Sequence, residues 1–167
     1  MLMKQSYFTL LFILLIAGGV GAQVQTRFLE GLSLEESGIF GVPRLGTVQE
    51  LPKIDLAKLM EEDDLQQSMA VPFRFGYAMD VNYSVSNSGR WYDKPEGRIW
   101  KLNLRSEGAY SINHIFDQLV LQVGGELYIY NGERTMLQGP LTAEITNKSH
   151  TYGTDLIQGD FITLELF

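Results

Sequence analysis

The sequence predicts an all-β fold, an antiparallel β-sandwich or jelly roll that follows a signal peptide and a loop-rich segment with one short helix. Apolar residues alternate strictly from Phe73 to Val85, which is the period of a half-buried strand. Further on, short strand-like runs recur with turn residues about every 8–12 positions. No helical pattern of useful length follows residue 70. This combination is typical of two-sheet antiparallel folds.

Composition limits the classes of function. A chain of 167 residues corresponds to one domain, and 45% hydrophobic with 20% charged residues is an ordinary globular composition. The net charge of −7 argues against nucleic acid as a partner, because an acidic surface repels phosphates. The sequence contains no cysteine, which excludes disulfides, cysteine-ligated zinc and thiol catalysis.

The first residues have the layout of a secretory signal peptide, residues 1–22. Lys4 provides the positive charge, residues 7–17 form the apolar run, and Ala22 precedes the expected cleavage point. The alternative is a membrane anchor, but the apolar run is far shorter than the roughly 20 residues that cross a bilayer. We therefore expect a secreted or cell-envelope protein that has no membrane partner once the signal is cleaved.

Residues 23–70 are expected to be a loop-rich segment, because glycines and prolines interrupt every periodicity. One short helix is predicted near residues 55–62, with Asp55 as its N-cap and an ion pair between Lys58 and Glu62. The acidic run 61–64 could suggest a cation site. It lacks the spacing of a calcium loop, so a solvated helix end is the preferred interpretation. A segment with so little apolar pattern is expected to pack on another surface.

Residues 71–167 are expected to form the β-sandwich domain. Turns are predicted at 86–89 and 106–108, and Asn131-Gly132 is the strongest signal for a two-residue hairpin. The predicted strands are 73–85, 97–105, 111–113, 118–123, 127–130, 134–137, 141–145, 154–157 and 161–167.

Side-chain alternation predicts which residues of these strands are buried. Trp100 shares a face with Leu102 and Leu104, so it is expected in the core. Tyr128 and Tyr130 share the face opposite Leu127 and Ile129. One of these two pairs is therefore expected to face solvent.

The sequence offers no catalytic constellation. The only two histidines are His114 and His150, and no Gly-x-Ser-x-Gly motif accompanies them. Ser149 and His150 are adjacent, so on a strand they would point in opposite directions. The two histidines also lack the spacing of metal ligands. No catalytic, cofactor-binding or metal-binding residue is therefore assigned, no cofactor is expected, and the chain is not expected to be an enzyme.

Two weaker groups of residues remain as binding candidates. Four carboxylates lie near turns, where they could hold a cation or a sugar, although turns attract aspartate in any case. They are Asp80, Asp93, Glu96 and Asp117. Five aromatic residues could stack sugars or simply pack in the sheet: Trp91, Tyr92, Trp100, Tyr128 and Tyr130. No basic patch accompanies them, which disfavours stacking on nucleic acid bases.

A series of short sequence segments in fixed order resembles a known family. They are 97–104 (Gly-Arg-Ile-Trp-Lys-Leu-Asn-Leu), 108–113 (Gly-Ala-Tyr-Ser-Ile-Asn), Phe116-Asp117, 124–131 (Gly-Gly-Glu-Leu-Tyr-Ile-Tyr-Asn) and 139–142 (Gly-Pro-Leu-Thr). Residues 51–55, Glu62-Asp63 and 72–76 resemble the lead-in of the same region. Together they resemble the non-catalytic N-terminal region of secreted bacterial trypsin-like serine endopeptidases of the lysyl endopeptidase type.

The resemblance covers about residues 50–167 and implies a function without chemistry. It implies that the chain is a pro-region, which assists folding of a protease domain or holds it inactive, and whose partner is a downstream protease domain of the same polypeptide. The chain stops at Phe167, before any such domain, so we expect it to be truncated there. None of the family's catalytic residues has a counterpart here. The alternative is a free-standing secreted β-sandwich that binds carbohydrate or a cell-surface partner.

Overall fold

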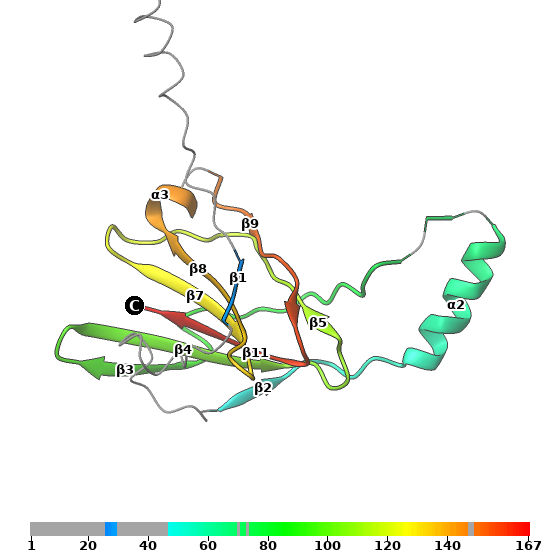
Figure 1. Ribbon diagram of the computed structural model, residues 1–167, viewed down its shortest axis with the longest axis horizontal. Coiled ribbons are helices and arrows are strands. Elements are labelled where there is room, and N and C mark those ends of the chain that lie inside the picture. Colours follow the sequence, from blue (N-terminus) through cyan, green and yellow to red (C-terminus); the bar gives the residue numbers. More distant parts are fainter. Residues whose placement is uncertain (1–25, 30–46, 70, 73, 147–148) are drawn as a thin grey trace, which may run out of the picture.

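The computed structural model describes residues 26–29, 47–69, 71–72, 74–146 and 149–167 (Figure 1). The predicted signal peptide, residues 1–22, lies outside this part of the chain, and so does most of 23–46. The described residues are mainly β-strands with two short helices, which confirms the all-β class. The elements are β1 (Thr26–Phe28), β2 (Val48–Glu50), α2 (Leu56–Ser68), β3 (Arg90–Lys94), β4 (Gly97–Arg105), β5 (Ser111–Ile112), β6 (Ile115–Phe116), β7 (Glu126–Asn131), β8 (Met136–Thr142), α3 (Ala143–Thr146), β9 (Tyr152–Gly153), β10 (Ile157–Gln158) and β11 (Phe161–Leu166).

Seven of these strands form one sheet in the order β1-β8-β7-β11-β4-β2, and β3 pairs with β4 as well. The pairs are antiparallel except that β2 runs parallel to β4, so the sheet is mixed, where the sequence predicted a purely antiparallel arrangement. Two short ladders, β10 with β5 and β6 with β9, complete the described β structure. The C-terminal strand β11 lies between β4 and β7, so the centre of the sheet is formed by strands that are far apart in sequence.

One face of the sheet carries the main hydrophobic core. Its central residues are contributed by β4, β7, β8 and β11, and the ladder residues Ile112 and Ile157 pack on them together with Leu119 and Leu121. Leu104, Leu141, Ile157 and Ile162 are completely buried. As predicted, Trp100 lies in this core, and its indole nitrogen donates to the Ser88 carbonyl at 2.8 Å.

The other face of the sheet is also buried, which the alternation did not predict. Tyr128 and Tyr130 form a second cluster with Leu137, while Leu127 and Ile129 lie in the main core. Neither pair therefore faces solvent, and the expectation that one pair would do so is wrong. A strand at the centre of a sheet with both faces covered buries residues of both parities. On such a strand, alternation therefore predicts which face is apolar and which is polar, but not which face is exposed to solvent.

The predicted strand 73–85 does not exist in the described residues. Residues 74–83 follow an irregular path, and turns begin at Val85. Tyr83 packs against the core, but Phe75, Tyr77, Val81 and Val85 are exposed. Alternation shows that a segment could form a half-buried strand. A strand also needs a neighbouring strand for its backbone hydrogen bonds. The described ladders leave residues 74–85 without such a neighbour.

Several further boundaries differ from those predicted, and of the predicted strand 154–157 only Ile157 lies in a strand, β10. Residues 118–123 form no strand, although Leu119 and Leu121 are buried, and the Leu119 amide donates to the His150 carbonyl at 2.7 Å. The runs 134–137 and 141–145 are joined in β8, which contains a cis Gly139-Pro140 bond and shifts its register against β7. Residues after Thr142 turn into α3. Gly139 accommodates this path, since a Cβ there would lie 2.7 Å from the Leu127 carbonyl oxygen.

The Asn131-Gly132 pair marks the β7–β8 hairpin correctly but not its turn type. Asn131 ends β7, and four residues precede β8 where the prediction had two. The residue with a positive φ is Arg134 (59°), whose amide donates to the Asn131 carbonyl. The Asn131 side chain accepts from the amides of Thr135 and Met136 at 2.9 and 3.0 Å. A side chain that caps both amides makes the longer loop stable without the two-residue turn.

Gly89 closes the predicted turn 86–89 at a position where no other residue fits. Its φ is +73°, and a Cβ would lie 2.6 Å from the Lys101 carbonyl oxygen and 2.7 Å from the Trp100 indole. We expect Gly89→Ala to lower the free energy of unfolding by roughly 2–3 kcal/mol, because it adds backbone strain and a clash with the core. Urea denaturation provides the measurement. Gly108→Ala is the matched control: φ is +79°, but nothing lies within 4 Å of its Cβ. Equal losses in both variants would show that the clash has no effect.

Helix α2 confirms the predicted helix and extends it. The Asp55 side chain caps it by accepting from the Lys58 amide at 3.1 Å, as expected. The helix does not end at residue 62 but continues through the acidic run to Ser68. Arg74 ion-pairs with both Glu62 and Asp63 at 3.1 Å, which relieves the repulsion among adjacent carboxylates. Glu62 therefore pairs with a residue from the returning chain, where Lys58 was predicted.

Candidate functional site

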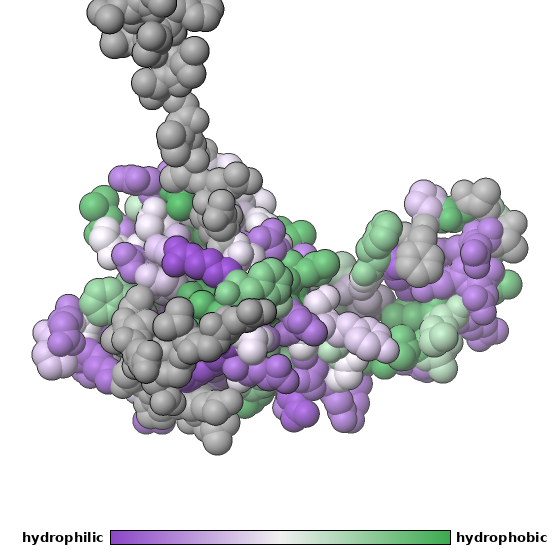
Figure 2. Space-filling view, in the orientation of Figure 1, coloured by the Kyte–Doolittle hydropathy of each residue, from purple (hydrophilic) through white to green (hydrophobic). Residues whose placement is uncertain are grey.

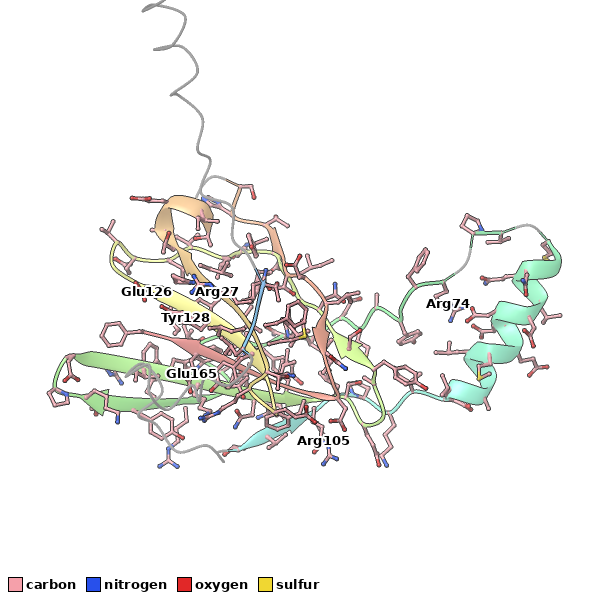
Figure 3. The ribbon with its side chains drawn as sticks, viewed as in Figure 1. Arg27, Arg74, Arg105, Glu126, Tyr128 and Glu165 are labelled. Atoms are coloured by element: carbon pink, nitrogen blue, oxygen red, sulfur yellow. The ribbon has the colours of Figure 1, made fainter. Side chains whose placement is uncertain are left out.

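The most distinctive surface is an arm that stands away from the sheet. We define the arm as residues 54–82, of which 54–69, 71–72 and 74–82 are described. It comprises α2 and the extended chain that returns from it to the sheet, and Figure 1 shows both projecting to one side of the β-strands. Figure 3 shows Arg74 on the returning chain, directed toward α2. The two ion pairs of Arg74 therefore hold the two halves of the arm together.

Helix α2 has an inner and an outer face. Leu59, Glu62, Asp63 and Gln66 are half-buried and recur with the spacing i, i+3, i+4, i+7, so they form the inner face. The outer face is exposed and mixes apolar with acidic side chains. It carries Leu56, Met60, Glu61, Asp64 and Leu65.

Exposed apolar residues are concentrated on the arm. Nine of the 18 exposed large hydrophobic residues in the described part of the chain belong to its 29 residues. They are Ile54, Leu56, Met60, Leu65, Met69, Val71, Phe75, Tyr77 and Val81. Figure 2 shows apolar and charged residues side by side over this part of the molecule. Soluble proteins scatter exposed apolar residues singly, so a concentration of this kind marks an interaction site.

A hollow lies at the foot of the arm, where it leaves β2. Its volume is about 500 Å³, and an exposed ion pair between Lys53 and Glu107 (2.9 Å) crosses its rim. The lining residues are Glu50, Leu51, Pro52, Lys53, Ile54, Arg105, Ser106 and Glu107. The hollow is thus continuous with the arm through Ile54.

The covered polar face of the sheet contains a buried ion pair. Lys101 on β4 lies opposite Glu165 on β11, and Lys101 Nζ is 3.2 Å from Glu165 Oε1. Both side chains are at most 2% exposed. The Tyr130 hydroxyl donates to the same oxygen at 2.8 Å. Two residues away along the same strands, the Thr163 hydroxyl donates to Asn103 Oδ1 at 3.0 Å. Figure 3 places Glu165 within the sheet.

This ion pair is best explained as part of the fold. Burial raises the pKa of the Glu165 carboxyl, and this outweighs the opposing effects of Tyr130 and Lys101. Among the described residues, no hydrogen-bond donor reaches Glu165 Oε2. Both side chains are almost fully buried, so a substrate could not reach them in this arrangement. Sequence reasoning missed it because the pairing of Lys101 with Glu165 depends on β11 lying next to β4, which the sequence does not reveal.

The residues singled out for chemistry do not gather into one site. Asp93 and Glu96 lie at the β3–β4 turn, where Asp93 pairs with Arg98 at 3.0 Å. Asp80 lies on the arm and Asp117 follows β6, and both are exposed. Within the described ranges, no three histidine, aspartate or glutamate side chains are close enough to hold a metal ion. The acidic run 61–64 belongs to α2, with two of its carboxylates paired to Arg74.

His114 is half-buried, and its environment predicts a pH effect. Burial lowers its pKa, and no donor or acceptor in the described part of the chain reaches Nδ1. A lowered pKa means that the folded state disfavours the charged ring, so stability is lost as pH falls through the unfolded value of about 6.5. We expect the free energy of unfolding to decrease between pH 7.5 and 5.5, and to decrease less in His114→Gln. Urea titrations of both proteins at a series of pH values test this. Identical slopes in the two proteins would contradict it.

The aromatic candidates divide between core and surface. Trp100, Tyr128 and Tyr130 are buried and cannot stack on a ligand. Trp91 on β3 is 37% exposed, but the Arg98 guanidinium lies 4.8 Å from its ring centroid and covers one face. Arg90 lies 5.7 Å from the ring centroid of Tyr92 in the same way. The only exposed candidates therefore sit on one hairpin, partly covered by arginine.

Comparison with known proteins adds no identification. No family model matches the sequence, and no solved structure matches the fold. No helix in the described part of the chain is long and apolar enough to cross a membrane.

Proposed function

We propose that this chain is a non-catalytic pro-region of a secreted, trypsin-like serine endopeptidase of the lysyl endopeptidase type, which assists folding of the protease domain or inhibits it. On this proposal, residues 1–22 direct export and are removed, and the chain functions in the extracytoplasmic space. The seven-stranded sheet and the two short ladders packed on it act as the layers of a β-sandwich scaffold. The protease domain follows in the same polypeptide.

The observation that carries the proposal is the arm. A pro-region needs a surface complementary to a partner domain and no chemistry of its own. The arm offers exposed apolar side chains on a helix and an extended segment, held together by Arg74, beside a well-packed sheet. Hydrophobic residues that remain exposed in this concentration are costly unless a partner covers them. The order of the sequence segments that resemble this family, from residue 50 onward, supports the same function.

A refolding assay tests the proposal. The catalytic domain encoded beyond Phe167 is denatured and diluted into buffer, with or without an equimolar amount of the purified chain. We expect the chain to raise the yield of active protease, or to inhibit protease that is already folded. Serum albumin at the same concentration is the control for nonspecific protection. A reading frame that stops at Phe167 with no protease gene beside it would overturn the proposal, and so would a catalytic domain that folds and works identically in both buffers.

A second candidate function is carbohydrate binding by a free-standing module. Exposed Trp91 on the β3–β4 hairpin favours it, since sugars stack on tryptophan rings. A glycan-array screen of the chain, with and without calcium, addresses this candidate. Binding that disappears in Trp91→Ala would support it, and an array without any signal would remove it.

A further inference from the structure

We propose that the outer face of α2, together with the exposed Tyr77 and Val81 of the returning chain, is the docking surface. It binds an apolar surface of the protease domain that is bordered by lysine and arginine. This inference rests on the proposed function and adds to it which residues make the contact and what chemistry they require of the partner. Four observations about the arm lead to it.

First, the arm is already shaped for binding. Arg74 is paired on one side with Glu62 and on the other with Asp63, and Asp55 caps the start of α2. These contacts connect the helix to the returning chain across 12 residues of sequence. A surface that is ordered before binding loses less conformational entropy when it docks.

Second, exposed apolar residues lie on both halves of the arm. Leu56 and Met60 are one helical turn apart on α2 and are 63% and 60% exposed. Tyr77 and Val81 extend along the returning chain and are 53% and 43% exposed. These exposed apolar side chains could form the buried apolar core that is typical of protein interfaces.

Third, the returning chain has the sequence of a strand without the structure of one. Residues 74–85 alternate with period two, yet no ladder in the described part of the chain includes them. A segment that favours the pleated conformation and has no neighbouring strand can add to the sheet edge of another domain.

Fourth, the charge of the arm selects the partner. Residues 54–82 contain six carboxylates and two cationic side chains. The inner carboxylates of Glu62 and Asp63 pair with Arg74, whereas Glu61 and Asp64 lie on the outer face. Docking to a second copy of this chain would place acidic arms against each other, which is repulsive. A partner with lysine and arginine around an apolar patch is complementary in both respects.

Charge reversal on the outer face tests the inference. The double variant Glu61→Lys/Asp64→Lys and the double variant Leu56→Ala/Met60→Ala are each titrated into the catalytic domain by calorimetry. We expect each to weaken binding roughly tenfold or more, since each removes contacts at the centre of the interface. For the original chain, added salt should weaken binding, and in the charge-reversed variant this salt dependence should disappear or change sign. Circular dichroism establishes that each variant is folded.

Matched control variants lie outside the arm. Glu96→Lys/Glu133→Lys reverses two exposed charges in the β3–β4 and β7–β8 turns, and Val123→Ala truncates a side chain that is 97% exposed. The controls should bind like the original chain. If the original chain binds and the arm variants bind equally well, the docking surface is wrong while the proposed function stands. If the original chain does not bind, both fail. Self-association that arm variants abolish would show that a second copy is the occupant, and would also overturn the inference.

Discussion

Lys101→Met should lower the free energy of unfolding by about 3–5 kcal/mol, one of the largest effects of any single substitution in the chain. Lys101 and Glu165 face each other across β4 and β11, and neither side chain is more than 2% exposed. Methionine fills the volume of the lysine stem but leaves the carboxylate without its cation. Within the described ranges, the remaining donor to Oε1 is the Tyr130 hydroxyl, and Oε2 has none. A buried carboxylate in this position is costly.

The pH dependence of the loss distinguishes electrostatics from packing. The pKa of Glu165 is already raised by burial, and removing Lys101 raises it further. An acid whose folded pKa is raised contributes stability when protonated and loses it as pH rises from the unfolded value, about 4.3. Lys101→Met should therefore cost more at pH 8 than at pH 5 in urea denaturation. The double variant Lys101→Met/Glu165→Gln keeps an acceptor for Tyr130 and should recover most of the loss. A single variant within about 1 kcal/mol of the original at pH 8 would contradict a desolvated pair.

Leu104→Ala should cost about 2–5 kcal/mol, because it removes three carbon atoms from the centre of the main core. Leu104 is completely buried on β4, opposite Ile162 of β11. The surrounding side chains come from paired strands, which limits how far they can move to fill the cavity. Leu156→Ala is the control, since Leu156 is 62% exposed and its loss should be within about 0.5 kcal/mol. Similar midpoints for the two variants in urea denaturation would mean that the core is not where the structure places it.

The strands were predictable where local pattern and tertiary pairing agree. The run 97–105 is β4 residue for residue, and the helix starts at the predicted cap, Asp55. The pattern was misleading at 73–85, because alternation does not reveal whether a neighbouring strand is present. It was incomplete for Lys101 and Glu165, whose pairing depends on β11 lying next to β4, about 60 residues away in sequence. Strand order of this kind is a property of the whole sheet and has no local signature.

The candidate site was predictable only in outline. From the sequence we expected residues 23–70 to pack on another surface and assigned no catalytic group, and both stay predictions. It did not indicate that Arg74 would reach back to Glu62 and Asp63, because that ion pair requires the helix to continue through the acidic run. With the helix extended to Ser68, one set of its residues faces the returning chain, and the set that includes Leu56 and Met60 is left exposed. The docking surface is a result of this geometry.

Hydrogen–deuterium exchange of the chain, alone and with the catalytic domain, tests the central claim most directly. If the arm is the binding element and the sheet its scaffold, amides in residues 56–69 and 74–82 should become protected in the complex. The interior strands β4, β7 and β11, already slow to exchange, should not change. Protection confined to the β3–β4 hairpin, or to the sheet edges with the arm unchanged, would contradict the account.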